Sequence, residues 1–202
     1  MQQTLVMLHG LTGSAKLMYP FAKKICPTGC ELYIPDAPFK HEKTGFCWWE
    51  YTADSKAKPQ KIKISTKLLE EITHSMRYLV KKIPSDGKII LGGFSQGAVM
   101  AQIMMLSEIS ERISGLVLLG TRAIEENKLR EALRNNNVIP TLWMHGKTDK
   151  IIDFDDSYEL VKIFEEEGWV LEKIIHEKGH MIPLSEHEKI KSFIQEVFSN
   201  NS

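Results

Sequence analysis

The segment that most restricts the fold is residues 88–106, KIILGGFSQGAVMAQIMML, in which two apolar runs are joined by a few small residues. The first run, 88–91, has the composition of a buried strand, and 98–106 has the length of a buried helix. The chain must therefore turn sharply at Ser95. Gly93 and Gly97 flank this serine, and glycine tolerates the close contacts that such a turn creates. The segment predicts a strand–turn–helix unit with a serine at its tip.

Strand-like and helix-like segments alternate along the rest of the chain. Apolar β-rich runs occur at 4–10, 30–38, 88–94, 115–120, 140–146 and 169–177. Helices are expected at 15–25, 65–83, 154–167 and 185–198. Pro20 is expected to kink the first helix or delay its start, and Ser185 and Glu188 have capping-box spacing in the last. The alternation predicts a mainly parallel, twisted sheet with helices on both faces, interrupted by one long irregular segment at 39–63.

Composition limits the classes of function. The 202 residues, 43% of them hydrophobic, suit one α/β domain over residues 1–202. The net charge of zero argues against nucleic acid or an anionic membrane as a partner. No apolar run approaches the roughly 20 residues of a membrane span, and the first residues lack a signal-peptide pattern, so we expect a cytoplasmic protein. Cys26 and Cys30 are followed by no second ligand pair, which favours reduced thiols over a metal site.

Three polar residues are predicted at one edge of this sheet, where the carboxyl ends of parallel strands form the ligand-binding edge. Ser95 follows the strand at 88–94, Asp149 follows 140–146, and His180 follows 169–177. This order, with Gly-x-Ser-x-Gly between strand and helix, is the nucleophile-elbow pattern of α/β-hydrolases. In that chemistry, His180 removes the Ser95 proton while Asp149 orients and stabilises the imidazole.

Two of these assignments have competitors. Three further aspartates follow Asp149: Asp153, Asp155 and Asp156. They fit the first turn of the helix 154–167, where carboxylates interact favourably with the helix dipole. His176 competes with His180, but it still belongs to the predicted strand, whereas His180 lies in the loop beyond it. His145 precedes a glycine at a strand end and is interpreted as a buried structural histidine.

The same edge must supply oxyanion donors and room for an acyl chain. The backbone N–H of Gln96 is predicted as one donor. The backbone N–H of Leu11, in a glycine-rich turn after the first strand, is predicted as the second. Trp48 and Trp49 lie in the irregular segment, so we expect them to shape a groove rather than the core. The full set of groove candidates is Leu11, Phe46, Trp48, Trp49, Ile151 and Met181.

Nearly the whole chain resembles the small carboxylesterase, lysophospholipase and acyl-protein thioesterase family. The similar motifs are LHGLTGS (8–14), WWEY (48–51), GGFSQGA (92–98), MHGKTDKII (144–152) and KGHMI (178–182). The resemblance implies an α/β-hydrolase fold with no large lid, no cofactor and no metal. It implies the same catalytic residues, Ser95, Asp149 and His180, with Leu11 and Gln96 as oxyanion donors. The sequence departs from the family pattern at Thr12, Ala98 and Asp153. These departures affect which substrate shape we expect the site to accept, and not the chemistry of the reaction.

The implied activity is hydrolysis of a carboxylic ester or thioester bond, and the implied substrate is a small acyl ester or a lipid. A homodimer is possible. Other hydrolases of this fold remain alternatives, namely those that open lactones or cleave C–C bonds, and peptidases. A lactone hydrolase of the dienelactone type would more naturally carry cysteine at position 95, and a peptidase would usually add a cap domain. A non-catalytic binding protein of the same fold is a further alternative, although all three triad positions are filled.

Overall fold

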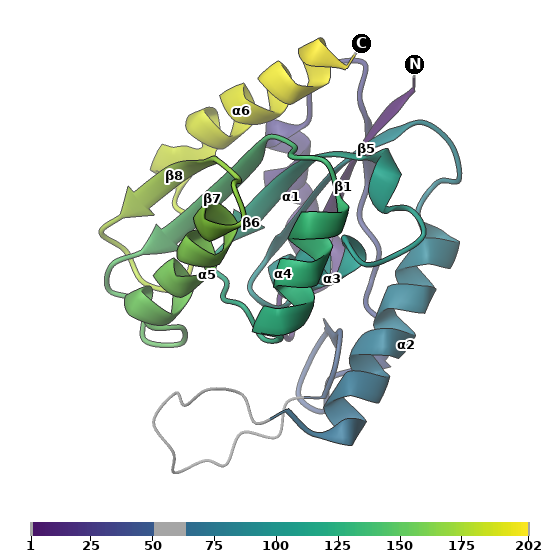
Figure 1. Cartoon of the computed structure of the whole chain (residues 1–202), viewed down its shortest axis with the longest axis vertical. Helices are drawn as coiled ribbons and strands as arrows, with labels where there is room; N and C mark the ends of the chain where they lie inside the picture. Colours follow the sequence, from purple (N-terminus) through teal and green to yellow (C-terminus); the bar gives the residue numbers. More distant parts are fainter. Residues whose placement is uncertain (1, 51–63, 202) are drawn as a thin grey trace.

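The computed structural model describes residues 2–50 and 64–201. Its centre is a six-stranded sheet in which every neighbouring pair is parallel (Figure 1). The spatial order of strands is β2-β1-β5-β6-β7-β8. Their bounds are β1 Gln3–Leu8, β2 Glu31–Tyr33, β5 Lys88–Phe94, β6 Ile113–Leu119, β7 Thr141–Gly146 and β8 Leu171–His176. The predicted parallel sheet is therefore confirmed.

Helices cover both faces of this sheet, and Figure 1 shows α3, α4 and α5 in front of it and α1 behind it. One face carries α1 (Ala15–Ile25) and α6 (His187–Asn200). The other carries α2 (Thr66–Lys82), α3 (Gln96–Met104), α4 (Glu126–Asn135) and α5 (Phe154–Glu166). Successive residues of β1 divide between the two cores, since Leu5 and Met7 pack with α1 and α6 while Val6 and Leu8 pack with the other helices.

Several boundaries differ from the sequence-based expectation. Helix α1 begins at Ala15, with the Ser14 side chain accepting from the N–H of Leu17, so Pro20 does not delay its start. The expected capping box is wrong, because Ser185 donates to its neighbour Glu186 and a 3-10 turn (Leu184–Glu186) precedes α6. Helix α4 was not predicted.

Residues 51–63 of the predicted irregular segment lie outside the described residues. Its first part, up to residue 50, contains a small antiparallel hairpin, β3 (Phe39–Lys40) and β4 (Phe46–Cys47). Gly45 in its turn has φ +64°, and a Cβ there would lie 2.2 Å from the carbonyl oxygen of Thr12. The N–H of Phe46 donates to the carbonyl of Gly13 at 2.8 Å. The hairpin thus packs directly against the turn that follows β1. Across the described ranges, no helix has both the length and the apolar character needed to cross a bilayer.

Candidate active site

Ser95 lies in the sharp turn between β5 and α3. Its backbone angles, φ 54° and ψ −116°, are unfavourable for a residue with a side chain. The neighbouring glycines make this turn sterically feasible. A Cβ at Gly97 would lie 2.2 Å from the carbonyl oxygen of Leu8, and one at Gly93 would lie 2.4 Å from the carbonyl carbon of Gly97. The strained turn thus holds the Ser95 hydroxyl at the carboxyl end of β5.

His180 connects Ser95 to Asp149. Its Nε2 lies 3.0 Å from Ser95 Oγ, and its Nδ1 lies 2.7 Å from Asp149 Oδ2. A carboxylate only accepts hydrogen bonds, so Nδ1 carries the proton and Nε2 presents its lone pair to the serine hydroxyl. The Phe94 ring lies against the imidazole, with 4.8 Å between centroids. This tautomer allows the imidazole to accept the hydroxyl proton.

Asp149 is buried, and its side chain is 1% exposed. Burial raises the pKa of this carboxyl group, but hydrogen bonds from His180 and from the N–H groups of Ile152 and Ile151 outweigh it and leave the pKa below its ordinary value. The two N–H groups donate to Oδ1 at 3.0 and 2.8 Å, respectively, while Oδ2 faces His180. The carboxylate is therefore held charged and in a fixed orientation.

A second imidazole lies beside this carboxylate. His145 is fully buried, its Nε2 donates to the carbonyl of Ile152 at 3.0 Å, and the same nitrogen is 3.4 Å from Asp149 Oδ2. Burial lowers the pKa of His145, so its ring stays neutral. Its interpretation as a buried residue agrees with the structure, but its contact with Asp149 was not foreseen, because nothing in the sequence distinguishes it from other histidines at strand ends.

The competing residues lie elsewhere. His176 ends β8, and its Nδ1 accepts from the N–H of Lys178 at 3.2 Å. Asp153 is the N-cap residue of α5, and two further aspartates occupy the first turn of that helix, Asp155 and Asp156. Within the described part of the chain, only Asp149 of the four aspartates contacts His180.

The two predicted oxyanion donors are the backbone N–H groups of Leu11 and Gln96. Neither N–H donates a hydrogen bond within residues 2–50 and 64–201. Leu11 belongs to the turn from Gly10 to Gly13, in which Thr12 adopts φ +64°. His9 holds this turn in place. Its Nε2 accepts from the N–H of Ala37, so its Nδ1 carries the proton and donates to the carbonyl of Gly10 at 2.7 Å.

A cavity of about 110 Å³ opens beside Ser95. Leu11, Trp49 and Ile151 line it, as the sequence predicts. The remaining three groove candidates do not line it: Phe46, Trp48 and Met181. Trp48 is fully buried in the larger core, so the expectation that it shapes a groove is wrong. Trp49 lines the cavity but is also buried in that core, so the expectation that it lies outside the core is wrong as well. The sequence could not show this, because Trp48 is held by hydrogen bonds to distant residues: its N–H and its ring donate to Gln96 and His9, and its carbonyl accepts from Ser75.

Two features of the cavity were not predicted. The Gln96 side chain accepts from the N–H of Trp48 and donates to the carbonyl of Trp49, which places the tryptophan segment against the elbow. Arg122, in the loop after β6, also lines the cavity. No spacing or motif in GTRAIEE singles out this arginine.

Among the described residues no group of histidine, cysteine or acidic side chains could hold a metal ion, and the three cysteines are free thiols.

The profile of the family described as Phospholipase/Carboxylesterase matches residues 1–198. The chain belongs to this family. Among curated proteins, this phospholipase/carboxylesterase family member is 25% identical over 162 residues to acyl-protein thioesterase 1 of Cryptococcus neoformans, covering 75% of the chain and 68% of the relative. It is 32% identical to acyl-protein thioesterase 1 of Debaryomyces hansenii over 88 residues, 43% of the chain and 37% of that relative.

Solved structures share the fold of this family member. Arabidopsis thaliana SOBER1 superposes with a TM-score of 0.77 at 19% identity, covering 98% of this chain and 100% of the other. Zea mays acyl-protein thioesterase 2 gives 0.75 at 19% identity, covering 97% and 94%. The Bacillus cereus carboxylesterase gives 0.71 at 18% identity, covering 98% and 89%. The fold is the α/β-hydrolase fold, with no large lid among the described residues, and the family supports a hydrolase of the esterase type.

Proposed function

We propose that the protein hydrolyses carboxylic esters or thioesters through an acyl-enzyme intermediate on Ser95. The observation that carries the proposal is the hydrogen-bonded chain from Asp149 through His180 to Ser95, with distances of 2.7 and 3.0 Å. It joins three side chains from three separate loops in the geometry of a serine hydrolase triad. A binding protein of this fold would have no need of such an arrangement, so it also argues against the non-catalytic alternative.

In the first half of the reaction, the Ser95 hydroxyl transfers its proton to Nε2 of His180 as its oxygen attacks the substrate carbonyl carbon. The carbonyl oxygen becomes an oxyanion and receives hydrogen bonds from the N–H groups of Leu11 and Gln96. Asp149 stabilises the charged imidazole. When the tetrahedral intermediate collapses, the bond to the leaving group breaks, and His180 donates its proton to the departing alcohol or thiol.

The second half repeats these steps with water. His180 takes a proton from a water molecule whose oxygen attacks the acyl carbon, and the same two N–H groups hold the second oxyanion. The acyl–oxygen bond to Ser95 then breaks, the proton returns to the serine, and a carboxylic acid leaves. No cofactor is needed for either half. The apolar lining from Leu11, Trp49 and Ile151 suits a hydrocarbon acyl group.

The substrate class follows from the site and the relatives together. Both curated relatives are acyl-protein thioesterases, which adds thioesters to the esters that the site chemistry accommodates. A cytoplasmic location is part of the proposal and agrees with three free thiols, which persist in a reducing compartment.

A panel of p-nitrophenyl esters from acetate to palmitate, with matched thioesters, tests the proposal. We expect turnover of both bond types and a fall in kcat/KM for acyl chains that exceed the small cavity. Ser95→Ala should lose this turnover while circular dichroism stays unchanged. Absence of turnover by folded wild type on every ester and thioester would contradict the proposed function.

A further inference from the structure

Among the residues that the structure describes, nine line the cavity beside Ser95, and Arg122 is the only one of these with a charged side chain. The others are apolar, apart from Ser95 and Gln96. The Arg122 side chain is 11% exposed. It also lines a second cavity of about 320 Å³ between α4 and α5, which Ile124 borders as well. Arg122 therefore lies at the boundary between the two cavities, and Asp156, the partner of its guanidinium group, lines the second cavity.

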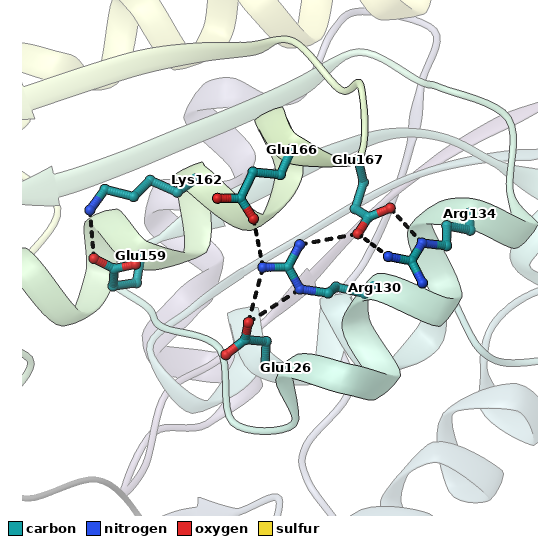
Figure 2. A network of polar contacts seen from close by, with 7 residues as sticks. All are labelled: Glu126, Arg130, Arg134, Glu159, Lys162, Glu166 and Glu167. Atoms are coloured by element: carbon teal, nitrogen blue, oxygen red, sulfur yellow. Dashed lines mark hydrogen bonds and ion pairs between the residues drawn. The ribbon is translucent and has the colours of Figure 1, made fainter.

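Among the residues with described positions, Arg122 uses little of its hydrogen-bonding capacity. Within residues 2–50 and 64–201, its guanidinium group has one partner, Asp156, whose Oδ2 lies 3.4 Å from Nη1. Arg130, on the wall of the second cavity, has several partners instead of one. Figure 2 shows its three nitrogens directed at three carboxylates, those of Glu126, Glu166 and Glu167. A guanidinium has five N–H donors, so the described part of the chain leaves donors of Arg122 available to a further acceptor.

The backbone beneath Arg122 is held in place by two helices. Gln102 of α3 donates from Nε2 to the carbonyl of Arg122 at 3.3 Å. Ser157 of α5 donates to the carbonyl of Thr121, and Ser157 in turn accepts from Nε1 of Trp143 at 3.1 Å. These contacts fix the loop but make no use of the guanidinium charge. A leucine or methionine side chain could occupy the same wall without breaking any of them.

A largely buried cation with one long ion pair costs desolvation energy that its pairing offsets poorly. An anionic ligand group in the same apolar cavity would offset that cost, because charges attract strongly where water is excluded. We propose that Arg122 selects substrates that carry an anionic group near the scissile bond. This inference rests on the proposed function of Ser95 and names a class of substrate for it: esters or thioesters bearing a carboxylate or a phosphate.

The anionic group has two chemical sources. It is either a carboxylate at the far end of a short acyl chain, or a phosphate on the alcohol that leaves. Arg122 can bind both through two parallel N–H donors. In either case the anion competes with Asp156, the present partner of Arg122.

Two matched pairs of substrates separate these sources. The first pair is the p-nitrophenyl monoester of a dicarboxylic acid and the p-nitrophenyl ester of the monoacid of equal chain length. The second is a monoacylglycerol phosphate and the monoacylglycerol with the same acyl chain. For each pair, the measured quantity is the ratio of kcat/KM for the anionic member to kcat/KM for the neutral member. Turnover of the neutral members tests the proposed function separately.

We expect Arg122→Met to lower this ratio about ten- to hundredfold for at least one pair, the size of a lost hydrogen-bonded charge interaction. The pair that responds identifies the source of the anion. Arg122→Lys should retain part of the ratio, because it keeps the charge but loses the planar fork. Arg134→Met, which removes an exposed arginine bound to Glu167, is the matched control and should leave both ratios unchanged.

Asp156→Asn provides a second test that keeps Arg122 and removes its competitor. The ratio should rise severalfold in this variant and stay constant in Asp155→Asn, on the same turn of α5. Binding gives a readout that needs no turnover: in Ser95→Ala, calorimetry should show weaker binding of the anionic esters when Arg122→Met is added. Equal ratios in wild type and folded Arg122→Met for both pairs, or no effect of Arg122→Met on that binding, would overturn the inference.

Discussion

Gln96 Oε1 accepts a hydrogen bond from the backbone N–H of Trp48 at 2.8 Å, across 48 residues of sequence. The other end of the same amide donates to the carbonyl of Trp49 at 2.9 Å. Gln96 also contributes one of the two candidate oxyanion N–H groups from its own backbone. One residue therefore joins the turn that carries Ser95 to the segment that forms a wall of the cavity.

The first prediction concerns this connection. Gln96→Leu leaves the Trp48 N–H and the Trp49 carbonyl buried without partners, so the free energy of unfolding should fall by about 1–3 kcal/mol or more. Turnover should fall through kcat, because the segment beside the oxyanion donors loses its support. Urea denaturation and steady-state kinetics measure both effects. Ser75→Ala, which removes one hydrogen bond to the Trp48 carbonyl, should destabilise the protein less. A Gln96→Leu variant as stable as wild type would contradict the prediction.

The second prediction separates the two tryptophans. Trp48 Nε1 donates to the carbonyl of His9 at 2.8 Å, whereas Trp49 Nε1 has no partner among the described residues. Trp48→Phe should therefore destabilise the protein more than Trp49→Phe, by about 1–3 kcal/mol, since the buried His9 carbonyl loses its donor. Trp49→Phe should instead alter the preference for acyl chain length. Equal loss of stability in the two variants, measured by chemical denaturation, would show that this hydrogen bond is unimportant.

The third prediction compares two histidines. His180→Ala should lower kcat by about three powers of ten or more, because it removes the base next to Ser95. His176→Ala should have a much smaller effect, since its ring nitrogen accepts from Lys178 rather than from Ser95. Steady-state kinetics on a short-chain ester measures both. If the ranks were reversed, His176 would be the base.

The fourth prediction concerns stability against pH. Burial lowers the pKa of four histidines in the folded protein: His9, His145, His176 and His187. In the unfolded chain they return to about 6.5, so the unfolded state binds more protons below that pH. The free energy of unfolding should be highest above about pH 6.5 and should fall as the pH decreases towards the folded pKa values. Asp149, whose folded pKa is lowered, adds a further loss at still lower pH.

Urea denaturation at several pH values between about 7.5 and 5 measures this slope. His9→Asn removes one of the buried histidines and should make the slope shallower, although the variant itself is less stable. A free energy of unfolding that does not change over this range would contradict the prediction.

Local chemistry made the elbow predictable. Gly93, Ser95 and Gly97 stand between an apolar strand and an apolar helix, and the structure places β5 at Lys88–Phe94, as the sequence indicates. The order of strand ends also predicted which loops meet, because parallel strands bring their carboxyl ends to one edge. The contacts of Ser95 with His180, and of His180 with Asp149, follow from that arrangement.

The parts that escaped prediction depend on contacts between distant segments. The position of Trp48 is decided by Gln96, Ser75 and His9, none of which is near it in sequence. Its segment has no periodicity that would indicate burial. Arg122 is equally inconspicuous, since its role at the cavity wall depends on the packing of its loop between α3 and α5.

The most direct test of the central claim, that His180 activates Ser95 as a nucleophile, is covalent labelling with a fluorophosphonate. The Ser95 oxygen bonds to phosphorus, fluoride leaves, and His180 takes the proton. Intact mass and peptide mapping should show one adduct, on Ser95, in wild type, none in Ser95→Ala, and labelling at least about a thousandfold slower in His180→Ala. An adduct on a different residue, or equal labelling rates in wild type and folded His180→Ala, would contradict the account.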